Sequence, residues 1–341
     1  MRKALITGIR GQDGAYLAKL LLELGYEVYG ADRRSGDSSY WRLDYLNIKD
    51  KIKLVYMDLL EYSNIMDVIK EIKPDEVYNL AAQSFVQVSF KQPLLTSEVN
   101  ALGVLRLLEA IRLYKPDIRF YQASTSEMFG IAKEVPQNEN TPFNPVSPYA
   151  VSKVFAHYIT VNYRLAYNMF NCCGILFNHE SPLRGIEFVT KKVVNTAVKI
   201  KYNLADKLVI GNVYAKRDWG YAPEYVYGMY LMLNHSEPGD YVLATNETHT
   251  VREFIDLVFE YLGISLKWYE DEMGIRAYSK EGKLIIQSSK EFYRPSEVPI
   301  LKGDYTKAKN ILKWEPKTKF EQLVKIMVDE ELKMLKISNL V

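Results

Sequence analysis

Residues 4–14 read Ala-Leu-Ile-Thr-Gly-Ile-Arg-Gly-Gln-Asp-Gly, an apolar run followed by glycines at positions 8, 11 and 14. Glycines directly after a strand let the chain turn sharply and let its backbone approach a pyrophosphate lying on the N-terminus of the next helix. A tight turn without a ligand is the simpler explanation of three glycines alone. Their place between a predicted strand, residues 3–7, and a predicted helix, residues 13–24, favours a dinucleotide site. Its expected contacts are Gly8, Ile9, Arg10, Gly11, Gln12, Asp13 and Gly14.

The alternation of strands and helices continues outward from this loop. Further strands are predicted at residues 27–31, 53–57, 75–81, 118–123 and 169–177, with helices at 61–72, up to 113, and at 149–167. This pattern predicts an α/β fold, a Rossmann-like doubly wound parallel sheet with helices on both faces. We expect residues 1–177 to form the dinucleotide-binding domain, with later returns to the sheet at about residues 208–245. Residues 178–341 would form a smaller, interleaved substrate-binding lobe.

The composition excludes several classes of protein. The 341 residues are 48% hydrophobic and 25% charged, and the formal net charge of +2 gives no reason to expect a nucleic-acid or membrane partner. No apolar stretch approaches the ~20 residues needed to span a bilayer. The cysteines, Cys172 and Cys173, are adjacent in a predicted strand, so their side chains point to opposite faces and do not favour a bridge. With no metal-binding spacing and no signal peptide, we expect a cytoplasmic protein.

The second predicted strand ends in Asp32-Arg33-Arg34, where the adenosine ribose of a dinucleotide is recognised. An acid there accepts a hydrogen bond from the 2′-hydroxyl of NAD, whereas an arginine pairs with the 2′-phosphate of NADP. The two arginines favour NADP, while Asp32 leaves NAD possible and a charged surface turn remains an alternative. Later strand ends supply further candidate cofactor contacts, namely Asp58, Leu59, Leu80, Ala81, Ala82, Gln83 and Ser84.

The clearest catalytic pattern is Tyr149-Ala150-Val151-Ser152-Lys153 at a predicted helix start. Residues four apart lie on the same helix face, so Tyr149 and Lys153 should be neighbours. A phenol normally titrates near ~10, and a nearby ammonium should lower that pKa and make Tyr149 a base. The pair also occurs by chance as exposed helix residues, but together with the glycine loop it indicates a dehydrogenase-type site.

A second acid–base group follows the strand predicted at residues 118–123. Thr125 and Glu127 should face the same crevice as Tyr149, because ligands lie beyond the carboxyl ends of parallel strands. A simple alcohol dehydrogenase needs no carboxylate there. Glu127 suits proton removal from a carbon next to a carbonyl, although it could also be only a helix cap or a loop charge.

Several stretches resemble GDP-mannose 4,6-dehydratases along essentially the whole chain. They are residues 4–14 (ALITGIRGQDG), 78–84 (YNLAAQS), 121–127 (YQASTSE), 147–150 (SPYA), 174–182 (GILFNHESP), 217–220 (RDWG) and 293–298 (YRPSEV). The resemblance implies an NADP cofactor, a GDP-hexose substrate and a homo-oligomer, dimer or tetramer. It matches Thr125, Glu127, Tyr149 and Lys153 to catalytic residues, and His179 and Arg184 to residues near the cofactor. Those matched to the GDP-sugar site are Ser84, Ser126, Asn178, Lys192, Arg217, Arg294 and Glu297.

The reaction implied by the resemblance is an internal oxidation, elimination and reduction of the sugar. Tyr149 would deprotonate the 4-hydroxyl and Glu127 would remove the proton from carbon 5, so that the 6-hydroxyl leaves as water. Asp32, residues 36–43 and residues 269–283 depart from the family pattern. A GDP-heptose dehydratase, an epimerase or a 4-keto reductase of the same fold remains an alternative, as does a non-catalytic dinucleotide-sensing protein.

Overall fold

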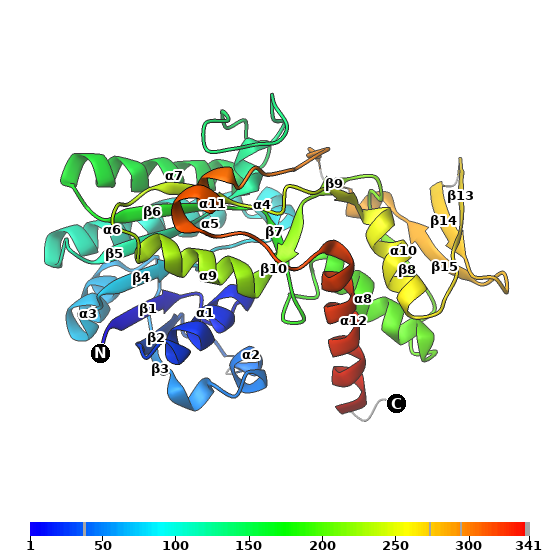
Figure 1. Ribbon diagram of the computed structural model, residues 1–341, viewed down its shortest axis with the longest axis horizontal. Coiled ribbons are helices and arrows are strands. Elements are labelled where there is room, and N and C mark those ends of the chain that lie inside the picture. Colours follow the sequence, from blue (N-terminus) through cyan, green and yellow to red (C-terminus); the bar gives the residue numbers. More distant parts are fainter. Residues whose placement is uncertain (37–38, 273, 294, 338–341) are drawn as a thin grey trace.

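Seven parallel strands form the main sheet, in the order β11-β6-β5-β4-β1-β2-β3 (Figure 1). The structure, a computed structural model, describes residues 1–36, 39–272, 274–293 and 295–337. The strands are β1 (Lys3–Thr7), β2 (Glu27–Asp32), β3 (Lys53–Tyr56), β4 (Glu76–Asn79), β5 (Arg119–Thr125), β6 (Asn171–Leu176) and β11 (Asp240–Leu243). The predicted Rossmann-like parallel sheet is therefore confirmed.

Helices cover both faces of this sheet because neighbouring strand residues point to opposite sides. On one face Ile6 packs in a core with α1 (Gln12–Glu23), α9 (Ala222–Leu233) and α11 (Thr306–Leu312). On the other face Leu5 packs in a core with α3 (Tyr62–Ile72), α6 (Gly103–Tyr114) and α7 (Pro148–Tyr167). Cys172 and Cys173 are both buried, free thiols in β6.

A smaller lobe lies at one end of the sheet (Figure 1). Its core joins α8 (Val189–Lys201), α10 (Val251–Tyr261) and α12 (Phe320–Ile337) to a second sheet of order β13-β14-β15-β8. These strands are β8 (Leu208–Ile210), β13 (Lys267–Asp271), β14 (Gly274–Tyr278) and β15 (Leu284–Ser288). Of the predicted return at residues 208–245, only β11 joins the main sheet as a strand, because β8 pairs with β15 instead.

Short elements connect the two lobes and surround the ends of the main strands. They are α2 (Trp41–Tyr45), η1 (Lys49–Lys51), α4 (Val86–Lys91), α5 (Pro93–Ser97), η2 (Glu98–Leu102), η3 (Ser126–Phe129), β7 (Asn178–Glu180), β9 (Lys216–Arg217), β10 (Trp219–Tyr221), β12 (His249–Thr250) and η4 (Lys290–Phe292). Strand β7 pairs with β10, so the chain leaving the main sheet is tied to the segment that returns from the smaller lobe to α9.

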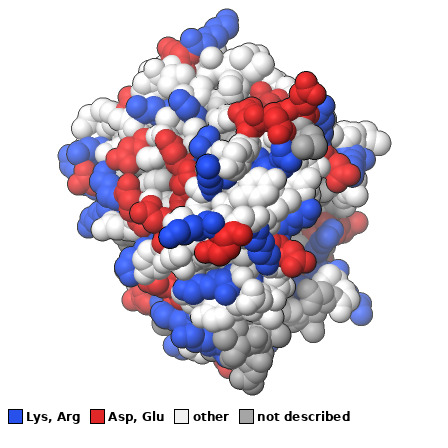
Figure 2. Space-filling model, turned by 90° about the vertical axis from the view of Figure 1, so that its right-hand side faces the viewer, with Lys and Arg blue, Asp and Glu red and all other residues white. Residues whose placement is uncertain are grey.

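The surface of the smaller lobe mixes both signs of charge. Figure 2 shows Lys and Arg side chains interspersed with Asp and Glu over this end of the molecule. That distribution agrees with the low net charge of +2. Among the described residues, no helix has the length and apolar character required to cross a bilayer.

Candidate active site

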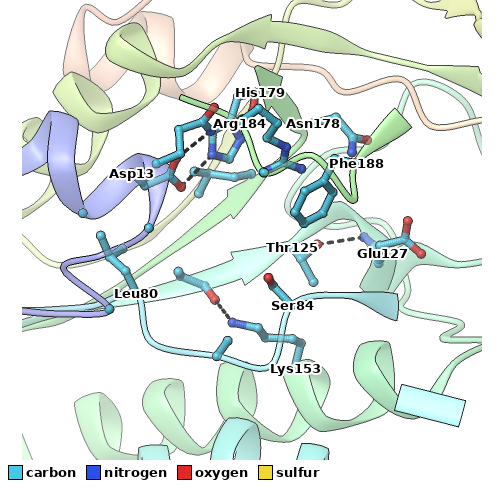
Figure 3. A pocket seen from close by; sticks show the side chains of 18 of the residues that line it. Asp13, Leu80, Ser84, Thr125, Glu127, Lys153, Asn178, His179, Arg184 and Phe188 are labelled. Carbon is cyan, nitrogen blue, oxygen red and sulfur yellow. Dashed lines mark hydrogen bonds and ion pairs between the residues drawn. The ribbon is translucent and has the colours of Figure 1, made fainter. Parts of the chain in front are cut away.

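A cavity of about 400 Å³ opens where β1, β4, β5 and β6 end. Its wall contains most of the residues that the sequence analysis assigned to a dinucleotide or to catalysis (Figure 3). Those present are Gly8, Arg10, Gly11, Gln12, Asp13, Gly14, Leu80, Ala82, Ser84, Thr125, Ser126, Glu127, Tyr149, Lys153, Asn178, His179 and Arg184. Segments far apart in the sequence therefore meet at one edge of the sheet.

The glycine loop leaves no room for a side chain at Gly8 or Gly14. Gly8 has φ of +71°, and a Cβ there would lie 2.9 Å from the backbone nitrogen of Ala81. A Cβ on Gly14 would lie 2.5 Å from the carbonyl oxygen of Gly8. Gly11, the N-cap of α1, offers no side chain to the first helical N–H groups. The loop therefore fits a pyrophosphate held by backbone N–H groups at a helix N-terminus.

An ion pair fixes the first turn of α1 to the segment after β6. His179 donates from Nδ1 to the carbonyl oxygen of Phe177 and from Nε2 to Asp13, both at 2.7 Å. Both partners accept only, so the imidazole carries two protons and a positive charge. Burial opposes that charge, but the Asp13 carboxylate outweighs it and raises the pKa of His179. Arg10, Arg42 and Arg184 line the same cavity, where guanidinium groups can donate to phosphate oxygens.

Some predicted cofactor residues lie outside the cavity wall. Arg33 and Arg34 are exposed at the surface after β2. Ile9 and Leu59 are buried in apolar cores, and Asp58 accepts from the backbone N–H of Leu60. Two further predicted contacts, Gln83 and Ala81, form hydrogen bonds within the protein instead. Gln83 folds back to bond Phe85 and Thr96, and the backbone N–H of Ala81 donates to Thr7 Oγ1.

The four proposed catalytic side chains come from three elements, β5, η3 and α7. Thr125 ends β5 and caps η3, accepting from the backbone N–H of Glu127 at 3.3 Å. Tyr149 and Lys153 lie on the first turns of α7, which begins at Pro148 because the Ser147 hydroxyl caps it. Tyr149, Lys153 and Glu127 are all at least nine-tenths buried. Figure 3 shows Thr125, Ser84 and Lys153 around one space, with the ring of Phe188 across from Thr125.

The prediction that Lys153 lowers the pKa of Tyr149 is wrong. Burial raises the pKa of Tyr149 to about 12, outweighing the hydrogen bond from Thr125 that lowers it. Burial also lowers the pKa of Lys153 to about 8. Its ammonium donates to the carbonyl oxygen of Ala123 at 2.9 Å and stands 5.9 Å from the tyrosine ring centroid. Desolvation therefore dominates, and a further positive neighbour is needed to favour the phenolate.

A second cavity of about 650 Å³ adjoins the first and extends into the smaller lobe. The two share Val86, Asn178, Arg184, Glu187 and Phe188. The Arg184 guanidinium lies 3.6 Å from the Phe188 ring centroid, so this pair forms part of the boundary between the cavities. A ligand that occupies both cavities would pass this boundary.

The predicted sugar-nucleotide residues Asn178, Lys192, Arg217 and Glu297 all line the second cavity. Arg217 is buried and pairs with Glu297 at 3.2 Å. The adjoining Asp218 accepts from the N–H groups of Thr245, Asn246 and Gly303, which holds three distant loops together. Burial raises the pKa of Asp218 to about 7. The predicted contact Arg294 lies outside the described residues.

Sequence reasoning missed several residues of the two walls. Arg42 lines the first cavity from α2 and donates to the carbonyl oxygens of Arg10 and Leu183. Its position in a segment without family resemblance gave no signal. Other unassigned wall residues are Val86, Glu187, Phe188, Asn195, Thr196, Asn212, Trp219 and Phe292. Trp219 belongs to the RDWG stretch at residues 217–220, whereas the others come from loops and helix faces that no short motif marks.

The parallel sheet, the glycine loop at the end of β1 and the Tyr149–Lys153 turn define a short-chain dehydrogenase/reductase of the extended type. Comparison with known proteins places the chain within that class. The family model described as GDP-mannose 4,6 dehydratase matches residues 5–327, and the chain belongs to this family.

Individual relatives match over nearly the full length. GDP-mannose 4,6 dehydratase 1 of Arabidopsis thaliana is 50% identical over 98% of this chain and 90% of its own. The human GDP-mannose 4,6 dehydratase is 45% identical over 98% of this chain and 92% of its own. Among solved structures, the dTDP-glucose 4,6-dehydratase of Bacillus anthracis, in complex with NAD, has a TM-score of 0.81. At 22% identity, covering 98% of both chains, that structure supports the fold alone.

Proposed function

We propose that the two joined cavities hold a nicotinamide dinucleotide and a GDP-sugar, and that the chain dehydrates GDP-mannose to GDP-4-keto-6-deoxy-mannose. The observation that carries this proposal is the presence of Glu127 in the same cavity wall as Thr125, Tyr149 and Lys153. An epimerase or a 4-keto reductase needs no carboxylate there. Family membership and the adjoining second cavity support a GDP-linked substrate.

Each catalytic side chain has a separate task in this reaction. Tyr149 takes the proton of the sugar 4-hydroxyl, and the Thr125 hydroxyl donates to the oxygen that becomes a carbonyl. That carbonyl acidifies carbon 5, from which Glu127 removes a proton before delivering one to the departing 6-oxygen. Lys153 holds the ribose hydroxyls beside Tyr149. A bound nicotinamide would supply the hydride chemistry, storing the hydride from carbon 4 for its later addition at carbon 6. The proton that Tyr149 took from the 4-hydroxyl then returns to carbon 5, so that only water is lost and no net reductant is consumed.

The proposed cofactor is NADP. Arg42 and Arg184 line the first cavity and offer guanidinium donors to phosphate oxygens, which supports a ligand that carries several phosphate groups. The oxidised nicotinamide is itself positive, so its presence beside Tyr149 would favour the phenolate that burial disfavours. The chemistry therefore depends on a loaded cofactor site. We expect it to take place in the cytoplasm, where the thiols of Cys172 and Cys173 remain reduced.

Incubation of the purified protein with GDP-mannose tests the function directly. We expect the sugar to lose the mass of one water, and the 4-keto product to absorb in alkali. GDP-mannose is the matched substrate, with UDP-glucose as the control that should remain unchanged. Recovery of unaltered GDP-mannose from cofactor-loaded protein would reject the proposed function.

We also propose that the chain forms a homo-oligomer, built from a dimer, through the outer faces of α5 and α7. Exposed apolar side chains follow α7 at helical spacing, namely Val151, Phe155, Tyr158 and Leu165, and Leu94 is 82% exposed on the contacting helix α5. Several exposed apolar side chains on neighbouring helices are typical of a subunit interface.

Replacing Phe155 by glutamate should convert the oligomer to monomers, because it would bury two unpaired carboxylates in a two-fold interface. Sedimentation velocity of wild type and variant would measure the change. Leu204→Glu, at an exposed apolar residue of the smaller lobe, is the matched control and should sediment as wild type does. A wild-type protein that sediments as a monomer would contradict the interface.

A further inference from the structure

The carboxyl end of β2 carries an acidic residue close to the glycine loop. Asp32 is the last residue of β2, and this strand pairs with β1 in a register that sets Ala31 beside Thr7. The adenosine ribose of a dinucleotide lies at this place in doubly wound sheets. A carboxylate there accepts a hydrogen bond from a 2′-hydroxyl and repels a 2′-phosphate. Asp32 taken alone would therefore select NAD.

Arg10 pairs with this carboxylate. Its Nε contacts Asp32 Oδ2, and its guanidinium carbon lies 4.5 Å from the centroid of the Tyr40 ring. The Tyr40 hydroxyl stands 3.5 Å from the same carboxylate oxygen. The side chains of Arg10 and Asp32 are only 23% and 15% exposed, so solvent screens their interaction incompletely.

Arg42 also fixes the backbone of Arg10 by hydrogen bonding. Arg42 donates from Nη1 to the carbonyl oxygen of Arg10 at 2.8 Å, and from Nε to that of Leu183 at 2.7 Å. Arg10 and Arg42 both line the first cavity. The guanidinium of Arg10 is thus fixed between Asp32, the Tyr40 ring and the cavity in which we propose the dinucleotide.

The neighbouring arginines are arranged differently. Arg33 and Arg34 are exposed and do not line the cavity. Their charges can attract a phosphate to this region, but among the described residues the ion pair of Asp32 is with Arg10. Arg10 is the cation that the structure sets against that carboxylate. A 2′-phosphate approaching Asp32 would meet an ion pair and not a bare negative charge.

We propose that Arg10 determines the choice between NADP and NAD by pairing with Asp32 and cancelling the charge that would otherwise reject a 2′-phosphate. This inference rests on the proposed function, because it requires a nicotinamide dinucleotide in the first cavity. It assigns to the second variable position of the glycine loop a role that the loop geometry alone does not need. Arg10 acts on selectivity through Asp32 and takes no part in the chemical steps.

Equilibrium binding of the two dinucleotides to Arg10→Ala tests the inference without measuring turnover. Protein freed of cofactor would be titrated with NADP+ and with NAD+ by calorimetry. We expect wild type to bind NADP+ more tightly. In the variant, the ratio of the two dissociation constants should move toward NAD+ by about 10- to 100-fold, as expected for losing one close charge partner. Arg10→Gln, which keeps a long side chain, should act in the same direction and serves if the alanine variant is unstable.

Lys49→Ala is the matched control. The Lys49 ammonium also lies over the Tyr40 ring, at 5.9 Å from its centroid, but pairs with Asp44 at 3.6 Å and not with Asp32. Removing this charge changes the local field without exposing Asp32. The ratio of dissociation constants should therefore stay within about twofold of wild type.

The Asp32→Asn background decides whether Arg10 acts through the carboxylate. With no charge to cancel, Arg10→Ala should change the ratio only slightly there. An effect of undiminished size would mean that Arg10 holds the phosphate directly, and would overturn the inference. So would an unchanged ratio in Arg10→Ala alone, or a wild type that prefers NAD+. A protein that binds neither dinucleotide would reject the proposed function as well, which separates the two failures.

Discussion

Turnover of GDP-mannose should fall by about 100- to 10,000-fold when Tyr149 is replaced by phenylalanine, the range typical of a lost general acid–base group. The substitution removes only the hydroxyl. Tyr149 is 8% exposed in the wall of the first cavity, and its ring is retained in phenylalanine. The binding of GDP-mannose should stay nearly intact, because the phenol acts on the barrier and does not anchor the nucleotide. Steady-state rates and a calorimetric dissociation constant would separate the two effects.

Tyr227→Phe provides the control for Tyr149→Phe. Tyr227 is 46% exposed on α9, away from the cavity wall, so loss of its hydroxyl should leave the rate unchanged. A Tyr149→Phe enzyme that turns over at a near wild-type rate would remove Tyr149 from the role of base.

Glu127→Gln should suppress release of the 6-deoxy-4-keto sugar by at least about 100-fold, since an amide can neither take up nor deliver the proton that elimination requires. Thr125 and Tyr149, which act on the 4-hydroxyl, are unchanged in this variant. The elimination alone should therefore fail. The N–H of residue 127 still donates to Thr125 Oγ1, so the turn of η3 should persist.

Mass spectrometry of the quenched reaction would measure the loss of water from the sugar. Glu23→Gln, an exposed carboxylate at the end of α1, is the matched control and should behave as wild type does. An unchanged product yield at an unchanged rate would reduce Glu127 to a charge in a short helical turn. The choice between a dehydratase and an epimerase or reductase would then reopen.

The central fold could be predicted from the sequence because several local signals coincide. The run from Lys3 to Gly14 combines an apolar strand, three glycines and a helical pattern, and each of these points to the same βα turn. The Tyr149–Lys153 spacing likewise requires nothing beyond helix geometry. The return to the main sheet predicted at about residues 208–245 is made by β11 but not by β8. A short apolar run cannot reveal its partner, and β8 pairs with β15, far along the chain.

The sequence predicted which segments reach the candidate site. It predicted less well which side chains of those segments point into the cavity. Arg33 and Arg34 follow β2 as expected, yet they are exposed and lie outside the cavity wall. Gln83 follows β4 as expected, but its side chain forms hydrogen bonds with the backbone of Phe85 in the same loop. The pKa of Tyr149 moves opposite to expectation, because burial, which no local pattern reveals, outweighs the lysine. Phe188 and Arg42 lie in a loop and in the short helix α2, and only the folded chain brings them to the cavity wall.

The boundary between the two cavities suggests how the protein could be re-engineered. Among the described residues, those that border both spaces are Val86, Asn178, Arg184, Glu187 and Phe188. The remaining wall of the second cavity belongs to other segments, among them α8 and the loop after β8. A combinatorial library confined to those segments could be selected for new sugar nucleotides while the acid–base residues stay constant. Under the proposed function, substrate choice and bond-breaking would then be altered separately.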